Sequence, residues 1–140
     1  MRNNYDYIIG IDTGVKTGFA VWNSKNKKLD KVETTNIHRV ILDIARSRAN
    51  YIDMLIRIED ARLRKWVQGG REKLQGVGSV KRDAKIFEDM CKELGIDYEL
   101  VPPKNNKTKL SAAAFKAITK WEGRTSEHSR DAAMLVFGYN

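Results

Sequence analysis

The most constraining feature of the sequence is the run YIIGID, from Tyr7 to Asp12, in which apolar residues end on a carboxylate. A short apolar run bounded by turn residues indicates a buried strand, and Thr13-Gly14 supplies the turn. An ionised carboxylate loses its hydration on burial, so it is rarely buried without a partner. Asp12 is therefore either a turn residue or a group that faces a positive charge.

Three strand-like runs precede the first helical pattern, and helices and strands alternate after it. Short polar turns between the first runs favour an antiparallel meander, whereas the later alternation favours parallel pairing. The sequence predicts one α/β domain over residues 1–140, with a mixed central sheet flanked by helices. We expect strands at 7–11, 17–22, 29–35, 52–58 and 98–101, a loop over 62–78, and helices around 40–45, at 80–94 and 110–121, and from 126 onward.

The charge balance of the chain favours a polyanionic partner. Twenty-six lysines and arginines face 18 acidic residues, which gives a net charge of +8 over 140 residues. Such a balance is most often associated with nucleic acid. No stretch approaches the roughly 20 apolar residues of a membrane span, and the N-terminus lacks the layout of a signal peptide. The single cysteine, Cys91, cannot form an internal disulfide, so we expect a cytoplasmic protein that does not contact a membrane.

Three acids stand at the ends of predicted elements. Asp12 ends the first strand, Glu59 ends the fourth, and Asp131 lies one turn into the last helix with His128 three residues before it. If the first and fourth strands are neighbours, Asp12 and Glu59 meet at one edge of the sheet. Crowded carboxylates raise one another's pKa, and a hard divalent cation such as Mg²⁺ relieves this. Taken singly, each acid is explained equally well as a turn cap, a solvated strand end or a helix N-terminal acid.

Two further acids compete with these. Glu127 adjoins His128, and Asp60 follows Glu59 directly. Because side chains alternate along a strand, only one of Glu59 and Asp60 faces the site, and Ile56 and Ile58 share the face opposite Glu59.

Three motifs together resemble those of a known family. IIGIDTGVKTGFAVW, then IRIEDA, then SEHSRDAAML are similar to the conserved motifs of the RuvC group of Holliday-junction resolvases, and the similarity covers nearly the whole chain in the same order. The resemblance implies an RNase H-like fold and Mg²⁺-dependent hydrolysis of phosphodiester bonds, with two ions per site and Mn²⁺ as a substitute. It implies a metal site of Asp12, Glu59, His128 and Asp131, in which His128 either binds metal or positions water.

The resemblance also implies a biological setting. Resolvases of this group act in DNA recombination and repair, as homodimers that nick two strands of a four-way junction symmetrically; forks and flaps are further possible substrates. The apolar stripe of the 80–94 helix would supply the dimer contact, although it could equally be buried in the monomer core. Thr13 stands where proline is common, and Arg62 stands where an aromatic residue is common, with Trp66 further on. The short segment between Lys104 and Leu110 is typical of bacteriophage members, so a bacterial or phage-infected cell is the expected setting.

Basic residues flank the proposed site on both sides. Such clusters neutralise phosphates and position a duplex without reading its bases, although lysine-rich loops are often merely solvated. We expect DNA contacts from Arg62, Arg64, Lys65, Arg71, Lys73, Lys81, Arg82, Lys104, Lys107 and Lys109.

Three other function classes fit the sequence less well. DTGVKTG also fits the phosphate loop of sugar kinases and actin-like ATPases, but those enzymes need two such domains. A non-catalytic nucleic-acid-binding domain would have no need of the acid set. An RNase H-type nuclease acting on RNA–DNA hybrids is the nearest alternative, and the HSRDAA ending and the basic loop favour the resolvase.

Overall fold

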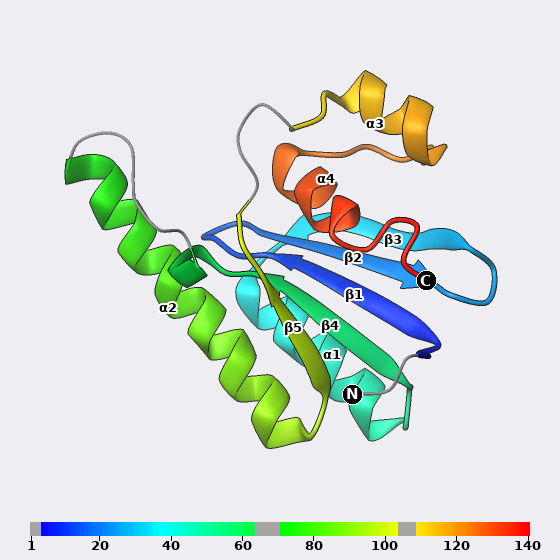
Figure 1. Cartoon of the computed structure of the whole chain (residues 1–140), viewed down its shortest axis with the longest axis horizontal. Coiled ribbons are helices and arrows are strands. Elements are labelled where there is room, and N and C mark those ends of the chain that lie inside the picture. Colours follow the sequence, from blue (N-terminus) through cyan, green and yellow to red (C-terminus); the bar gives the residue numbers. More distant parts are fainter. Residues whose placement is uncertain (1–3, 64–70, 104–108) are drawn as a thin grey trace.

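The computed structural model describes residues 4–63, 71–103 and 109–140, and its centre is a five-stranded sheet in the order β3-β2-β1-β4-β5 (Figure 1). The first three strands form an antiparallel meander, whereas β1 pairs with β4 and β4 with β5 in parallel. The predicted mixed α/β sheet is therefore confirmed. The first and fourth strands are neighbours, which was the condition for Asp12 and Glu59 to meet. The strands are β1 (Tyr7–Asp12), β2 (Thr17–Asn23), β3 (Lys28–Thr35), β4 (Met54–Glu59) and β5 (Asp97–Val101).

Helices cover both faces of this sheet (Figure 1). On one face, α1 (Ile37–Ala49) and α2 (Arg71–Leu94) bury a core that includes Ile56, Ile58 and Phe87. On the other face, α3 (Ala112–Thr119) and α4 (Glu127–Met134) cover a second core that includes Leu55 and Phe115. Neighbouring residues of β4 thus point to opposite layers, as the alternation of a strand requires.

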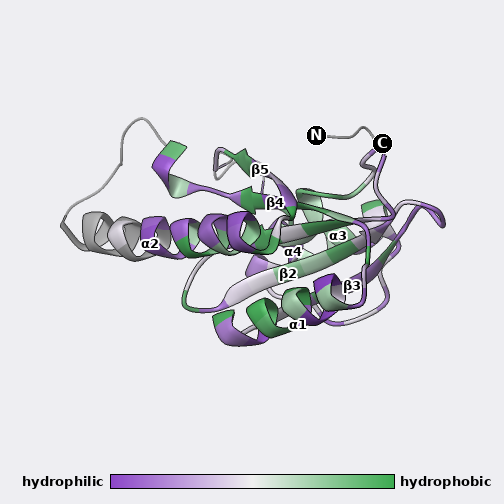
Figure 2. Cartoon of the chain, turned by 90° about the horizontal axis from the view of Figure 1, so that it is seen from below, coloured by the Kyte–Doolittle hydropathy of each residue, from purple (hydrophilic) through white to green (hydrophobic). Residues whose placement is uncertain are grey.

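Apolar and polar positions alternate along α1 and α2 in the hydropathy colouring of Figure 2. On α2, Ala84, Phe87 and Cys91 are completely buried against the sheet. The apolar stripe of this helix therefore belongs to the core of the monomer, which was the alternative to a dimer contact.

One predicted boundary is wrong. The segment 62–78 was expected to be a loop, but it is helical from Arg71 onward, where the 24-residue helix α2 begins. A short 3₁₀ helix, η1 (Ala61–Leu63), follows β4. Glycine in a helix costs only about 1 kcal/mol relative to alanine, so Gly76 and Gly78 do not end it. No helix within the described ranges is long and apolar enough to cross a membrane.

Candidate active site

The parallel pairing of β1 and β4 places Asp12 and Glu59 side by side. These two residues are register partners at the carboxyl ends of their strands. The hydroxyl of Thr13 donates a hydrogen bond of 3.3 Å to the Glu59 carbonyl and ties the turn after β1 to the end of β4. Two residues before Glu59, Arg57 donates to the Leu135 carbonyl just after α4. Glu59 therefore belongs to the face of the sheet that α4 covers.

A capping box fixes the start of α4 above this edge. The Ser126 hydroxyl accepts from the Ser129 backbone N–H, and the Ser129 hydroxyl accepts from the Ser126 N–H in return. The Ser126 hydroxyl is also hydrogen-bonded to the Thr34 hydroxyl at the end of β3. This reciprocal capping stabilises a helix of only eight residues and joins it to the sheet.

Two glycines let α4 approach the strands closely. A Cβ atom on Gly18 would lie 2.0 Å from the His128 carbonyl oxygen, and one on Gly10 would lie 2.2 Å from that of Ala132. Any side chain at these positions would collide with the helix backbone. This role of the two glycines was not predicted, although glycine inside an apolar strand is a recognised sign of close backbone approach.

The close approach brings His128 onto Asp12. The two are joined by a contact of 3.1 Å between His128 Nδ1 and Asp12 Oδ2. Asp12 is only 6% exposed, and burial, followed by the charge of Asp131, raises its pKa from 3.8 to about 7; Lys109 opposes this rise and Glu127 adds to it. The question posed by the buried carboxylate thus has a structural answer, because an imidazole and a nearby ammonium face Asp12.

Lys109 is the cation closest to the acids of α4 among the described residues. Its ammonium lies 2.7 Å from Glu127 Oε1 and 3.3 Å from Asp131 Oδ2. The hydrogen bond from Lys109 holds the pKa of Glu127 below its usual range. The sequence predicted Lys109 as a phosphate contact and Glu127 as a rival acid, but it gave no sign that they pair.

Asp60, the other rival acid, lies away from this cluster. It is 1% exposed and forms an ion pair of 2.7 Å with Arg62. The same guanidinium reaches Glu88 on α2 at 2.9 Å, and Glu88 in turn accepts from the Tyr98 hydroxyl. Asp60 therefore anchors η1 to α2, on the face of the sheet opposite to α4, as the alternation of β4 predicts.

The side chains of this cluster are of the chemical type that binds a hard divalent cation, although in the described residues they lie farther apart than the ligands of a bound metal. Within the described part of the chain, no three acidic, histidine or cysteine side chains already converge at metal-binding separation. Carboxylate oxygens are the ligands that Mg²⁺ prefers, and such a cation would offset the acidic charge that, after burial, raises the pKa of Asp12. Asp12, Glu59 and Asp131, with His128 beside them, are the residues that could hold it.

The predicted DNA-contacting residues differ in what the structure says of them. Arg82 is exposed and Lys81 is half-buried in the middle of α2, whereas the guanidinium of Arg62 is held by Asp60 and Glu88. Arg71 and Lys73 belong to the first turns of α2, but their side chains are not described. Arg64, Lys65, Trp66, Lys104 and Lys107 lie outside the described residues.

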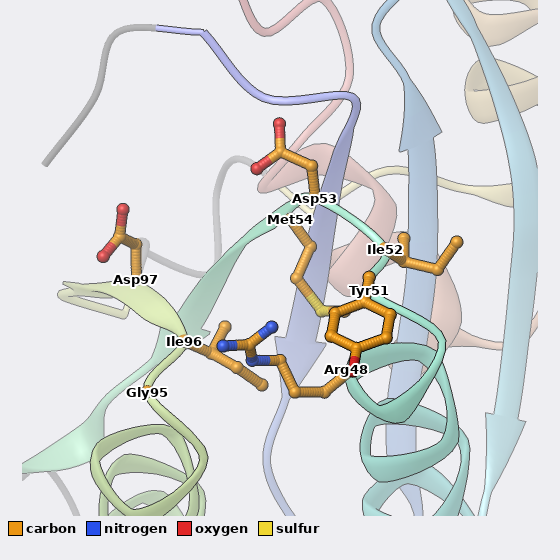
Figure 3. Close-up of a pocket in the computed structure, with 8 residues that line it drawn as sticks. All are labelled: Arg48, Tyr51, Ile52, Asp53, Met54, Gly95, Ile96 and Asp97. Carbon is orange, nitrogen blue, oxygen red and sulfur yellow. The ribbon is translucent and has the colours of Figure 1, made fainter.

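A hollow lies at the end of the sheet opposite to the acid cluster. It has a volume of about 510 Å³ and lies between the C-terminus of α1, the start of β4 and the turn from α2 to β5 (Figure 3). Arg48 and the exposed ring of Tyr51 line it, together with Asp53 and Asp97. The six residues of β4 separate this hollow from Glu59 by roughly 17 Å, so it is distinct from the acid cluster.

Comparison with known proteins gives a structural match and no sequence match. No protein-family model matches the chain, and no curated protein matches it. The structure is similar to Thermus thermophilus RuvC in complex with a Holliday junction substrate, with a TM-score of 0.57 and 16% sequence identity over 90% of this chain and 87% of that one. The mixed sheet with flanking helices is thus the RuvC-like, RNase H-like fold.

Proposed function

We propose that this chain is a metal-dependent endonuclease that cleaves branched DNA, such as Holliday junctions, by symmetric nicking as a homodimer. The observation that supports the proposal is that Asp12 and Glu59 are register partners, that His128 contacts Asp12, and that the charge of Asp131 acts on Asp12, within a RuvC-like fold. These residues come from two strands and one helix that are far apart in the sequence. Turn capping and helix capping do not require them to meet.

Each side chain of the cluster would have a role that depends on its position. Asp12 and Glu59 would offer carboxylate oxygens from the ends of β1 and β4, and Asp131 would offer one from α4. When bound there, Mg²⁺ supplies positive charge that offsets the charge developing on the phosphate and favours formation of the attacking hydroxide. Two ions per site, with Mn²⁺ as a substitute, belong to the same proposal.

His128 would hold a proton or a water at its second ring nitrogen. Its Nδ1 faces Asp12, so an ionised Asp12 accepts from Nδ1–H, whereas a protonated Asp12 donates to it. Either arrangement fixes the orientation of the imidazole ring and leaves Nε2 for the reaction. Because a carboxylate that orients a histidine determines which nitrogen is available, we assign Nε2 to a water or a metal.

The DNA would lie across the end of the sheet where β1 and β4 stop. The N-terminal part of α2 extends past this end (Figure 1). Glu88 on α2 contacts Arg62 just after β4, and the exposed Arg82 lies six residues before Glu88, toward the N-terminus of the helix. With a net charge of +8, the chain has cations available for phosphate contacts that position the substrate without reading bases. The apolar stripe of α2 is buried in the core of the monomer, so the proposed dimer would form through another surface.

A cleavage panel tests the proposal. Four-way junction, fork, linear duplex and RNA–DNA hybrid would be incubated with wild type and with Asp12→Asn, with and without Mg²⁺. We expect Mg²⁺-dependent, symmetric nicking of the junction by wild type, and binding without cleavage by the variant. Preferential cleavage of the hybrid would support an RNase H-type nuclease, and binding without cleavage by wild type would support a non-catalytic domain.

A further inference from the structure

The acid cluster contains its own cation, and the fold fixes where that cation lies. Arg130 on α4 donates through Nε to the Leu110 carbonyl at 2.9 Å, and its Nη1 donates to Thr125. These bonds hold the segment beginning at Lys109 against the first turn of the helix. The position of the Lys109 ammonium between Glu127 and Asp131 is thus supported by its neighbours in the chain.

The two acids that share Lys109 differ in their surroundings. The Asp131 side chain is 17% exposed and faces Asp12, whereas the Glu127 side chain is 58% exposed and four residues earlier on the same face of α4. Lysine is ordinarily cationic at neutral pH, and the ammonium of Lys109 lies 2.7 Å and 3.3 Å from the two carboxylates. It therefore offsets part of the negative charge of the cluster.

A divalent cation at the site would bind the Asp131 carboxylate that Lys109 now contacts. Mg²⁺ binds carboxylate oxygens at about 2.1 Å, and its double charge would repel an ammonium on the same carboxylate. Glu127 gives the ammonium a second partner that it already touches. Movement away from Asp131 therefore does not leave the lysine without a carboxylate.

We propose that Lys109 is a resident counter-ion that competes with the divalent cation for Asp131 and is retained by Glu127 alone once that cation binds. The proposal rests on the metal-dependent function above, and it names the residue that sets metal affinity. It also accounts for the open geometry of the cluster, because one of its carboxylates is already occupied by an ammonium.

The test measures Mn²⁺ affinity by calorimetry, without DNA and at low ionic strength. We expect Lys109→Met to tighten Mn²⁺ binding about three- to tenfold, in line with the modest strength of half-exposed ion pairs. Lys116→Met is the matched control, because it removes the same charge from an exposed lysine that pairs with Glu122 beyond α3. It should change the affinity less than twofold, and circular dichroism would check that both variants are folded.

A second measurement follows the lysine directly. In an NMR titration with Mg²⁺, the side-chain signals of Lys109 should shift in wild type and stay in place in Asp131→Asn. Equal Mn²⁺ affinities for wild type and Lys109→Met, or a Lys109 signal unaffected by Mg²⁺ at saturation, would overturn the counter-ion role and leave the nuclease proposal standing. If wild type binds no Mn²⁺ at all, the metal-dependent function itself fails, and the counter-ion role fails with it.

Discussion

Asp12 is a buried acid whose protonation affects the stability of the chain without metal. Its carboxyl is buried near Asp131 and Glu127 and contacts His128, and the charge of Lys109 partly offsets that of the acids. An acid whose pKa is raised by folding destabilises the folded state once the pH is high enough to ionise it. A buried carboxylate is thus retained here at a cost to stability, as is common at functional sites.

The first prediction concerns the stability of Asp12→Asn without metal. Between pH 3.8 and about pH 7 the folded chain retains a proton that the unfolded chain has lost, so stability falls as pH rises through this window. The asparagine removes that loss, and the variant should be more stable than wild type above pH 7 by roughly 1–4 kcal/mol. Near pH 4 the two should be alike. Denaturant unfolding in EDTA at pH 4, 6 and 8 measures this, and a difference independent of pH would contradict it.

The second prediction separates Glu59 from Asp60. Glu59→Gln should abolish Mg²⁺-dependent cleavage, and the fold should remain intact because the amide has a shape similar to that of the carboxylate. Asp60→Asn should retain most of the cleavage by folded protein but lose about 1–3 kcal/mol of stability, because the buried partner of Arg62 loses its charge. Cleavage rates at low temperature and thermal melts would be measured together. An inactive but stable Asp60→Asn would mean that Asp60, and not Glu59, serves the site.

At the scale of elements, the register of β4 and the placement of α4 determine which residues lie together at the candidate site. The alternation of IRIEDA was sufficient to predict which acid faces which layer, because the period of a strand is local. The course of residues 71–78 was not predictable in the same way, since glycines and basic residues are compatible with both a loop and a helix. Likewise, the pairing of Lys109 with Asp131 joins a loop to a helix, and no local pattern encodes it.

The third prediction concerns the contact between α4 and the sheet. Gly18→Ala should push His128 away from Asp12, because the new methyl group would lie 2.0 Å from a backbone carbonyl that cannot yield without moving the helix. We expect a loss of several kcal/mol and of metal-dependent cleavage.

Gly78→Ala is the control for this change. Nothing lies within 4 Å of the corresponding position, which is exposed on α2, so the same substitution should stabilise the protein by up to about 1 kcal/mol. Thermal melts of both variants decide the matter, and a Gly18→Ala protein as stable as wild type would show that α4 does not rest on β2 as described.

At the scale of the whole molecule, the fold was predictable because its determinants are patterns of elements. Three short strands followed by alternating helices and strands admit few topologies, and the resemblance of three motifs selected one of them. The DNA-binding surface was less predictable. Arg62 was grouped with its basic neighbours, yet the structure gives its guanidinium two acidic partners that only the folding of η1 onto α2 brings together.

The last prediction assigns the DNA to one end of α2. Arg82 and Lys92 lie ten residues, or roughly 15 Å, apart on this helix, and their side chains are 71% and 60% exposed. Arg82 precedes Glu88, which contacts Arg62 just after the end of β4, whereas Lys92 is in the last turn of α2, just before β5 begins beside the start of β4. Each phosphate contact adds about 0.9 to the slope of log affinity against log salt concentration. We therefore expect Arg82→Ala to weaken binding of a four-way junction and to reduce this slope by about one, while Lys92→Ala leaves both unchanged.

Fluorescence anisotropy in Ca²⁺ between about 50 and 200 mM salt would measure the slopes. Equal slopes for wild type and Arg82→Ala, or a reduced slope for Lys92→Ala alone, would place the DNA elsewhere on the molecule.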